Sequence, residues 1–157
     1  MAASAIGMLV ERRKAIAAKQ GIVYGVPEWD EPRVFVRFRP LAHHELKAAQ
    51  GRIERAKDKA AAEVDANAGL LVKACVEVWG DYGDGEKTPL SPKPEDGLTK
   101  FDGNLAQALG LPAESLASNV LKTLFMREGD ILSCAQYLAT QSGYREAEGD
   151  EELAGES

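Results

Sequence analysis

The clearest pattern in the chain is a strict alternation over residues 33–39, RVFVRFR, where Val34, Val36 and Phe38 share one face. A period of two predicts a β-strand. Pro40 has no backbone N–H for a strand partner and therefore ends it. The shorter run 22–24 is expected to pair with this strand. A two-stranded ribbon is marginal alone, so we expect it to pack against helices.

The remaining periodicity is helical. Residues 3–19 predict an amphipathic helix that Gly21 stops. From Pro40 to about Val78 two more helices are expected, the second capped by Asp65 or Asn67. One face of the first helix is mostly apolar, with residues that recur at spacings of three and four: Ile6, Leu9, Val10, Arg13, Ile16 and Ala17.

Glycine and proline divide the second half of the chain. Residues 80–100 hold four glycines and three prolines and predict a mobile loop. Beyond it, Asp102 is expected to cap a short helix that Gly110 ends. Two further helices follow. The expected boundaries are a start at Pro112, a cap at Asp130 and an end at Gly143.

The predicted fold class is mainly α: a compact helical domain with a minor short β-ribbon near the N-terminal third. Its parts are an N-terminal amphipathic helix over 1–20, a single helical domain over 21–144 and an acidic disordered tail over 145–157. The expected core is apolar: Leu46, Ile53, Leu70, Leu71, Cys75, Val78, Leu105, Leu109, Val120, Leu121, Leu124, Leu132 and Leu138.

Composition is ordinary for one globular domain of 157 residues, at 45% hydrophobic and 28% charged. The net charge of −6 is concentrated at the C-terminal end, where residues 145–157 hold six acidic side chains and one arginine. Such a segment buries too little apolar surface to offset chain entropy. A partner-binding tail is the alternative. The N-terminus lacks the order of a signal peptide, and no apolar run is long enough to span a bilayer.

The sequence points to no catalytic, cofactor or metal site. Cys75 and Cys134 lie in apolar helical patterns and are expected as buried free thiols. His43 and His44 are adjacent at a helix start, so their side chains diverge too far to hold one metal. The acidic residues near Asp81 lack the ligand spacing of a calcium loop. No phosphate-binding or nucleophile motif is present, and an enzyme is not expected.

Basic residues form two groups, one around Arg12 and Arg13 and one at Arg33, Arg37 and Arg39. Nucleic-acid binding is not favoured, because the chain is acidic and shows no aromatic residues interleaved on a sheet. Trp29 and Trp79 are expected to be packing residues. The profile is that of a protein-binding module.

At VFVRFRPLAHHELKAAQ the chain resembles the tail assembly chaperones of long-tailed phages. In that family a strand reading V-x-V-R-x-R/K-P-L runs into a helix that begins with Glu-Leu, here Glu45 and Leu46. Three later pieces agree in order: DANAGLLVKACVEVWG, FDGNLAQALGL and VLKTLFMREGDILSCAQYLATQSGY. The resemblance covers residues 33–144 and excludes the N-terminal helix and the 80–100 loop.

The resemblance implies a non-enzymatic protein that binds and solubilises the tape measure protein and assists tail-tube polymerisation. Its partners would be the tape measure protein and, as a further candidate, the major tail-tube protein. Self-association stays open, and no membrane partner is expected. The family implies the short form made before a programmed frameshift, present in the host cytoplasm and absent from the mature virion. No partner-binding residue can be assigned from the sequence.

Two other functions stay open. One is a structural phage protein that completes the tail or connects head and tail. The other is a small regulator that binds nucleic acid through Arg33, Arg37 and Arg39.

Overall fold

The computed structural model describes residues 2–19, 21–92 and 99–144. These residues form a mixed α/β fold with a helical majority and a four-stranded antiparallel sheet. The sheet is larger than the expected ribbon, so the fold is not plainly mainly α. In chain order the elements are α1 (Ala2–Lys19), β1 (Ile22–Gly25), β2 (Arg33–Phe38), α2 (His43–Arg55), α3 (Lys59–Ala74), β3 (Cys75–Asp81), β4 (Thr88–Pro89), α4 (Gly103–Ala108), α5 (Ala117–Phe125) and α6 (Glu128–Gln141).

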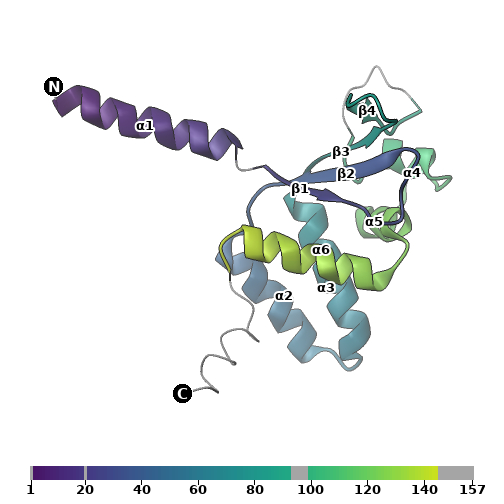
Figure 1. Ribbon diagram of the computed structural model, residues 1–157. Coiled ribbons are helices and arrows are strands. Elements are labelled where there is room, and N and C mark those ends of the chain that lie inside the picture. Colours follow the sequence, from purple (N-terminus) through teal and green to yellow (C-terminus); the bar gives the residue numbers. More distant parts are fainter. Residues whose placement is uncertain (1, 20, 93–98, 145–157) are drawn as a thin grey trace, which may run out of the picture.

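The sheet has the strand order β1-β2-β3-β4. The predicted strand and its pairing with residues 22–24 are confirmed, with Ile22 opposite Phe38 and Tyr24 opposite Val36. The fully buried side chains of Val34, Val36 and Phe38 point to one face. Helices α3, α5 and α6 lie on that side of the sheet (Figure 1). The period-two pattern therefore marks the core-facing side of the sheet.

The predicted helix through Val78 is wrong. Helix α3 ends at Ala74, and the chain continues as β3, which pairs with β2. The expected caps are wrong as well. The carboxylate of Asp58 caps α3 by accepting from the Ala61 N–H at 3.1 Å, while Asp65 and Asn67 lie inside the helix. A continuous apolar run fits a buried strand and a buried helix equally well, which explains the error.

The predicted loop over 80–100 is wrong at both of its ends. Gly80 and Asp81 belong to β3, and Thr88 and Pro89 form β4. Thr99 bridges to Val78, whose N–H donates to the Thr99 carbonyl at 2.6 Å. Residues 93–98 lie outside the described residues, as does the predicted tail 145–157.

Some predicted helix ends are confirmed and others are not. Asp102 caps α4 by accepting from the Leu105 N–H at 3.1 Å, and Gly110 and Gly143 follow helices with positive φ. Pro112 does not begin a helix, because α5 starts at Ala117. Asp130 lies within the first turn of α6 and does not cap it.

The core lies between the sheet and the helices. The predicted core residues are buried except for four that pack partly buried against it: Leu46, Ile53, Leu109 and Leu132. The list of expected core residues lacked the inward residues of β2, which are buried, and it lacked Phe125 and Ile131, which are buried as well.

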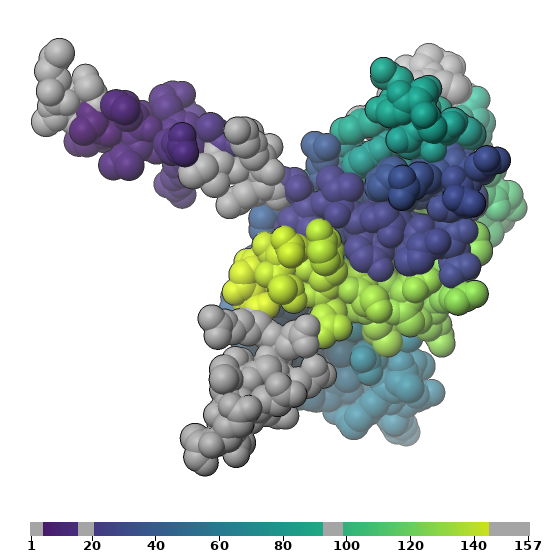
Figure 2. All heavy atoms as spheres, in the orientation of Figure 1, coloured from purple at the N-terminus to yellow at the C-terminus, as the bar shows by residue number. Residues whose placement is uncertain are grey.

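Helix α1 projects away from the rest of the molecule (Figures 1 and 2). Every side chain from residue 5 to residue 15 is exposed. Ile6 is 66% exposed and Leu9 is 71% exposed. The helix was predicted correctly, but its apolar side chains between residues 5 and 15 are exposed and do not join the core. Among the described residues, no helix combines the length and the apolar character that a membrane span requires.

Candidate functional site

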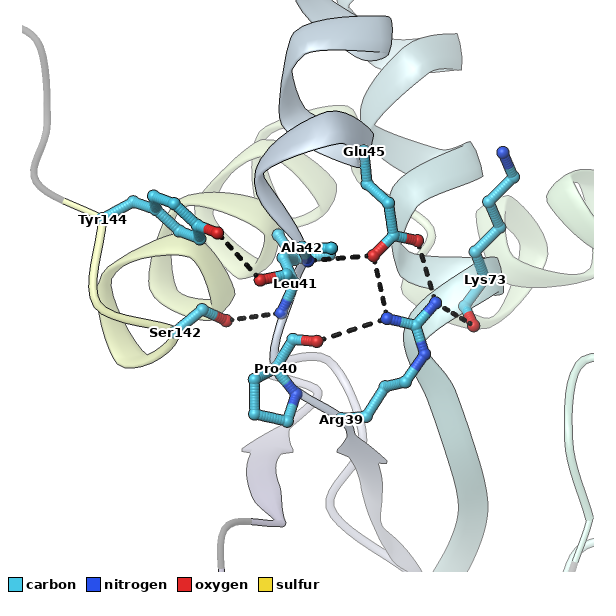
Figure 3. A network of polar contacts seen from close by, with 8 residues as sticks. All are labelled: Arg39, Pro40, Leu41, Ala42, Glu45, Lys73, Ser142 and Tyr144. Atoms are coloured by element: carbon cyan, nitrogen blue, oxygen red, sulfur yellow. Dashed lines mark hydrogen bonds and ion pairs between the residues drawn. The ribbon is translucent and has the colours of Figure 1, made fainter. Parts of the chain in front are cut away.

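The junction between β2 and α2 is built around an ion pair, shown in Figure 3. The Arg39 guanidinium donates to both carboxylate oxygens of Glu45, each at 2.8 Å. It also donates to the backbone carbonyls of Pro40 at 3.2 Å and Lys73 at 3.3 Å. Glu45 Oε1 accepts in addition from the Ala42 N–H at 3.0 Å. One arginine thus holds the end of β2 against both α2 and the end of α3.

The electrostatics of this junction favour the ionised carboxylate. Hydrogen bonds from Arg39 lower the pKa of Glu45 to about 2, assisted by the Ala42 N–H and opposed by burial. The same pair raises the pKa of Arg39. The Glu45 side chain is only 8% exposed, whereas that of Arg39 is 45% exposed. The ion pair therefore has a structural role, and its carboxylate is shielded from water.

The C-terminal end of α6 closes on the same junction. The Leu41 N–H donates to Ser142 Oγ at 2.9 Å, and the Tyr144 hydroxyl donates to the Leu41 carbonyl at 3.1 Å. Ser142 also donates to the Leu138 carbonyl at 2.7 Å. Residues of the strand-helix motif and of the last segment that carries the resemblance therefore meet in one network (Figure 3).

The outer face of the sheet carries an aromatic and charged cluster that the sequence prediction missed. Phe35 and Trp79 lie opposite each other in the β2–β3 register and stack with ring centroids 5.7 Å apart. The Arg33 guanidinium lies over Phe35 at 5.8 Å, and Arg37 lies over Trp79 at 5.6 Å. The statement that no aromatic residues interleave with basic ones on a sheet is therefore wrong. The Arg-Phe-Arg alternation on one face of β2 was the available signal.

This cluster is closed to a stacking base. Trp79 is only 7% exposed, and the Lys87 ammonium covers its ring at 4.5 Å. The buried Glu77 carboxylate forms ion pairs with both cations. Its Oε1 lies 2.6 Å from Lys87 Nζ and 3.3 Å from Arg37 Nε. Bases bind to aromatic platforms that present an open ring face. The cluster fits a role in holding the β3–β4 hairpin onto the sheet.

The three arginines at 33, 37 and 39 do not form one patch. Arg33 lies over Phe35, while Arg37 pairs with Glu77 and Arg39 with Glu45. The pairing of two of the three weakens the case for phosphate binding along β2. The second basic group, near Arg12 and Arg13, lies on α1 and is exposed.

The histidines and cysteines have the exposure that the sequence predicted, although Cys75 lies in β3 and not in a helix. His43 and His44 are exposed at the start of α2, as predicted. Cys75 and Cys134 are free and buried, as predicted. Burial raises the pKa of both thiols, that of Cys75 to about 12. Within the described ranges, no three His, Cys, Asp or Glu side chains gather closely enough to hold a metal.

Several hollows mark the surface of the described residues, and two of them lie where the sheet meets the helices. The first, called here the apolar groove, has a volume of about 250 Å³ and lies between the sheet and helices α4 and α5. The second, the β1–α6 hollow, has a volume of about 350 Å³. The apolar groove is lined mainly by Trp29, Val34, Tyr82, Leu105, Leu109 and Leu124. The β1–α6 hollow is lined by Gly21, Ile22, Val23, Pro40, Tyr137, Gln141 and Ser142.

Trp29 joins the segment between β1 and β2 to the helical layer at the edge of the apolar groove. Its indole N–H donates to the Leu124 carbonyl at 2.7 Å. This bond satisfies one of the carbonyls that the C-terminal end of α5 leaves without a helical partner. Trp29 therefore packs, as predicted.

Searches against protein-family models, curated proteins and solved structures each find no match to this chain. The functional interpretation therefore rests on the chain's own residues. Those residues present a clamped strand-helix junction, an apolar groove and an exposed amphipathic helix.

Proposed function

We propose that this protein is a phage tail assembly chaperone that binds and solubilises the tape measure protein and assists tail-tube polymerisation. The convergence of the motif residues is the observation that carries the proposal. Arg39, Glu45 and Ser142 belong to segments on which the resemblance rests, and they are bonded into one network around Leu41 and Ala42. These hydrogen bonds support the proposal because they join the strand-helix motif to the last of the segments that carry the resemblance.

The apolar groove is the proposed binding surface for the tape measure protein. Its volume of about 250 Å³ is below the roughly 300–1,000 Å³ of small-molecule sites, but it can take apolar side chains from a docked helix. Tyr82 lines it and is 63% exposed. A long helical protein with an apolar stripe would cover this surface and thereby hide its own aggregation-prone face.

A co-expression pull-down with the tape measure protein of the same phage tests the proposal. Tyr82→Asp should weaken capture, because a docked apolar helix would bury the new carboxylate. Val76→Asp is the matched control, since Val76 is 44% exposed at the start of β3 and lies outside the groove. Equal capture of the tape measure protein by both variants would show that it binds outside the apolar groove. No capture by the wild-type chain would contradict the proposed function.

Two further observations separate the proposed function from its alternatives. The gene should carry a slippery heptamer near the codons for residues 153–157, with an overlapping frame that extends the protein. Purified virions should lack the protein. A stoichiometric band in virions would instead support the structural tail-completion or connector role. Salt-sensitive nucleic-acid binding that Arg37→Ala/Arg39→Ala abolishes would support the regulator.

A further inference from the structure

Strand β1 leaves one edge of the sheet free. It stands at the end of the strand order and pairs with β2 on its other side, with Tyr24 opposite Val36 (Figure 1). Among the residues that the structure describes, no other strand joins β1 at this edge. Its sequence, IVYG, lacks the charged residues and the proline with which sheets usually guard an edge. The unpaired backbone groups of such an edge favour pairing with another strand.

The register between β1 and β2 determines which backbone groups are free. The Val26 N–H, just beyond the end of β1, donates to the Val34 carbonyl at 2.9 Å, so residue 26 directs its backbone groups toward β2. These directions alternate along an antiparallel strand, and the even-numbered residues of β1 therefore face β2 as well. Val23 and Gly25 face the other way. Their N–H and carbonyl groups form the free edge.

The side chains at these two positions complement each other. Val23 has an apolar side chain and is 38% exposed, whereas Gly25 has none. A Cβ on Gly25 would contact the Phe35 ring at 3.4 Å, and a hollow of about 140 Å³ borders both residues. If β1 pairs antiparallel with a copy of itself about Tyr24, Val23 of each copy lies opposite Gly25 of the other. The valine side chain then occupies the space that the glycine leaves beside Phe35.

The β1–α6 hollow lies along the same edge. It is lined by residues 21–23 and by the polar side chains of Gln141 and Ser142. Hydrogen-bonding groups in its walls suit the polar backbone of an extended strand, whose N–H and carbonyl groups need partners. This hollow therefore leaves room beside β1 for the strand of a second copy.

Charge also favours a second copy. In the self-antiparallel register, the segment that follows β1 in one copy lies at the N-terminal end of β1 in the other. That segment carries the exposed acidic residues Asp30 and Glu31. Helix α1 joins the N-terminal end of β1 and carries the exposed basic residues Arg12, Arg13 and Lys14. Opposite charges thus come to the same end of the paired strands, once at each end.

We propose that two copies of this chain pair through their β1 edges around a two-fold axis at Tyr24 and form one continuous antiparallel sheet. Val23 of each copy exchanges backbone hydrogen bonds with Gly25 of the other. The same edge serves both copies, so the pairing closes on itself. The edge strand at the opposite end of the sheet, β4, is short and holds Pro89, which guards it against further pairing. This pairing does not rest on the proposed function.

Sedimentation equilibrium of the full chain measures the pairing, and the wild-type protein should be a concentration-dependent dimer. Val23→Lys should raise the dissociation constant by about tenfold or more, because lysine removes the apolar contact at Gly25 and lies opposite Arg37 on β2. Val76→Lys is the matched control, since Val76 is 44% exposed on β3, away from the edge. Both variants should keep the wild-type melting midpoint. A monomeric wild-type protein, or equal effects of the two substitutions on the dissociation constant, would overturn the proposal.

Amide hydrogen exchange, followed residue by residue, locates the contact. The Val23 and Gly25 amides should exchange slowly at high protein concentration and rapidly after dilution, because only the dimer gives them acceptors. The Ile22 and Tyr24 amides face β2 and should be protected at both concentrations. Leu9→Asp on α1 should leave the dimer unchanged. A dimer that Leu9→Asp dissociates, with rapid exchange at Val23 and Gly25 throughout, would place the contact on α1 and overturn the proposal.

Discussion

Arg39 and Glu45, six positions apart, join the end of β2 to the start of α2 through two hydrogen bonds of 2.8 Å each. A bidentate arginine–carboxylate pair fixes both the distance and the angle between the groups that it joins. Pro40 ends the strand between them, so the chain must change direction at this point. The pair therefore sets how the helical layer leaves the sheet.

The first prediction concerns the charge of Glu45. Its pKa is lowered to about 2, so the folded protein binds this proton less readily than the unfolded chain does. The contribution to stability is complete above about pH 4.5 and is lost as the pH falls toward about 2. Glu45→Gln should lower the free energy of unfolding at neutral pH by about 2 kcal/mol. It should also flatten the pH dependence of that free energy in acid.

Chemical denaturation at a series of pH values measures both effects. Glu54→Gln is the matched control, because Glu54 is an exposed glutamate on the same helix. The free energy of unfolding of the Glu54→Gln control should depend on pH in acid as that of the wild-type protein does. An unchanged pH profile in Glu45→Gln would show that the ion pair does not stabilise the fold.

The second prediction contrasts two leucines. Leu71 on α3 is fully buried, and Leu71→Asp would bury an unpaired charge. The substitution should lower the free energy of unfolding by more than about 4 kcal/mol and unfold the domain. Leu116 is 69% exposed and is the N-cap residue of α5, with no side-chain cap. Leu116→Asp should be neutral or stabilise the domain by up to about 1 kcal/mol, because aspartate accepts from free N–H groups there. In thermal melts, Leu71→Asp should lose the folding transition and Leu116→Asp should keep the wild-type midpoint or raise it. An unchanged melt for Leu71→Asp would contradict the assigned core.

Strand β2 could be predicted because its apolar and polar residues alternate, which is typical of a sheet that packs one face against the core. It failed at β3 because CVEVWG follows α3 without glycine or proline, and its apolar residues continue the helical pattern. The β-branched and aromatic residues Val76, Val78 and Trp79 were the signal that favoured a strand. Burial of Glu77 between Arg37 and Lys87 depends on sheet register and could not be read from spacing.

The site was predictable only in part. Arg39 and Glu45 lie close together because a strand ends just before a helix. Both residues also belong to the strand-helix motif described in the sequence. Contact of Leu41 with Ser142 joins positions 101 apart, and stacking of Phe35 on Trp79 requires the β2–β3 pairing. Such contacts depend on tertiary packing, which local propensity does not encode.

The third prediction uses a matched pair of helical glycines. A Cβ on Gly103 would lie 2.9 Å from the backbone carbonyl oxygen of Ala113, which cannot move away as a flexible side chain could. Gly103→Ala should therefore destabilise the domain by about 1 kcal/mol or more. A Cβ on Gly129 would meet nothing within 4 Å, and Gly129→Ala should stabilise α6 by up to about 1 kcal/mol. In urea denaturation, the two substitutions should change the free energy of unfolding in opposite directions. Equal changes would contradict the close approach at Gly103.

The fourth prediction concerns the two thiols. Cys134 is fully buried and Cys75 is 8% exposed, and burial raises the pKa of each. Since the thiolate is the reactive form, both should react with a thiol reagent only as fast as the protein opens. Ser133→Cys supplies the control, because Ser133 is exposed on α6 next to Cys134. The introduced thiol should react at once in the native protein, while the two natural thiols react fully only in denaturant. Rapid reaction of all three without denaturant would mean that the helical layer opens readily over Cys134.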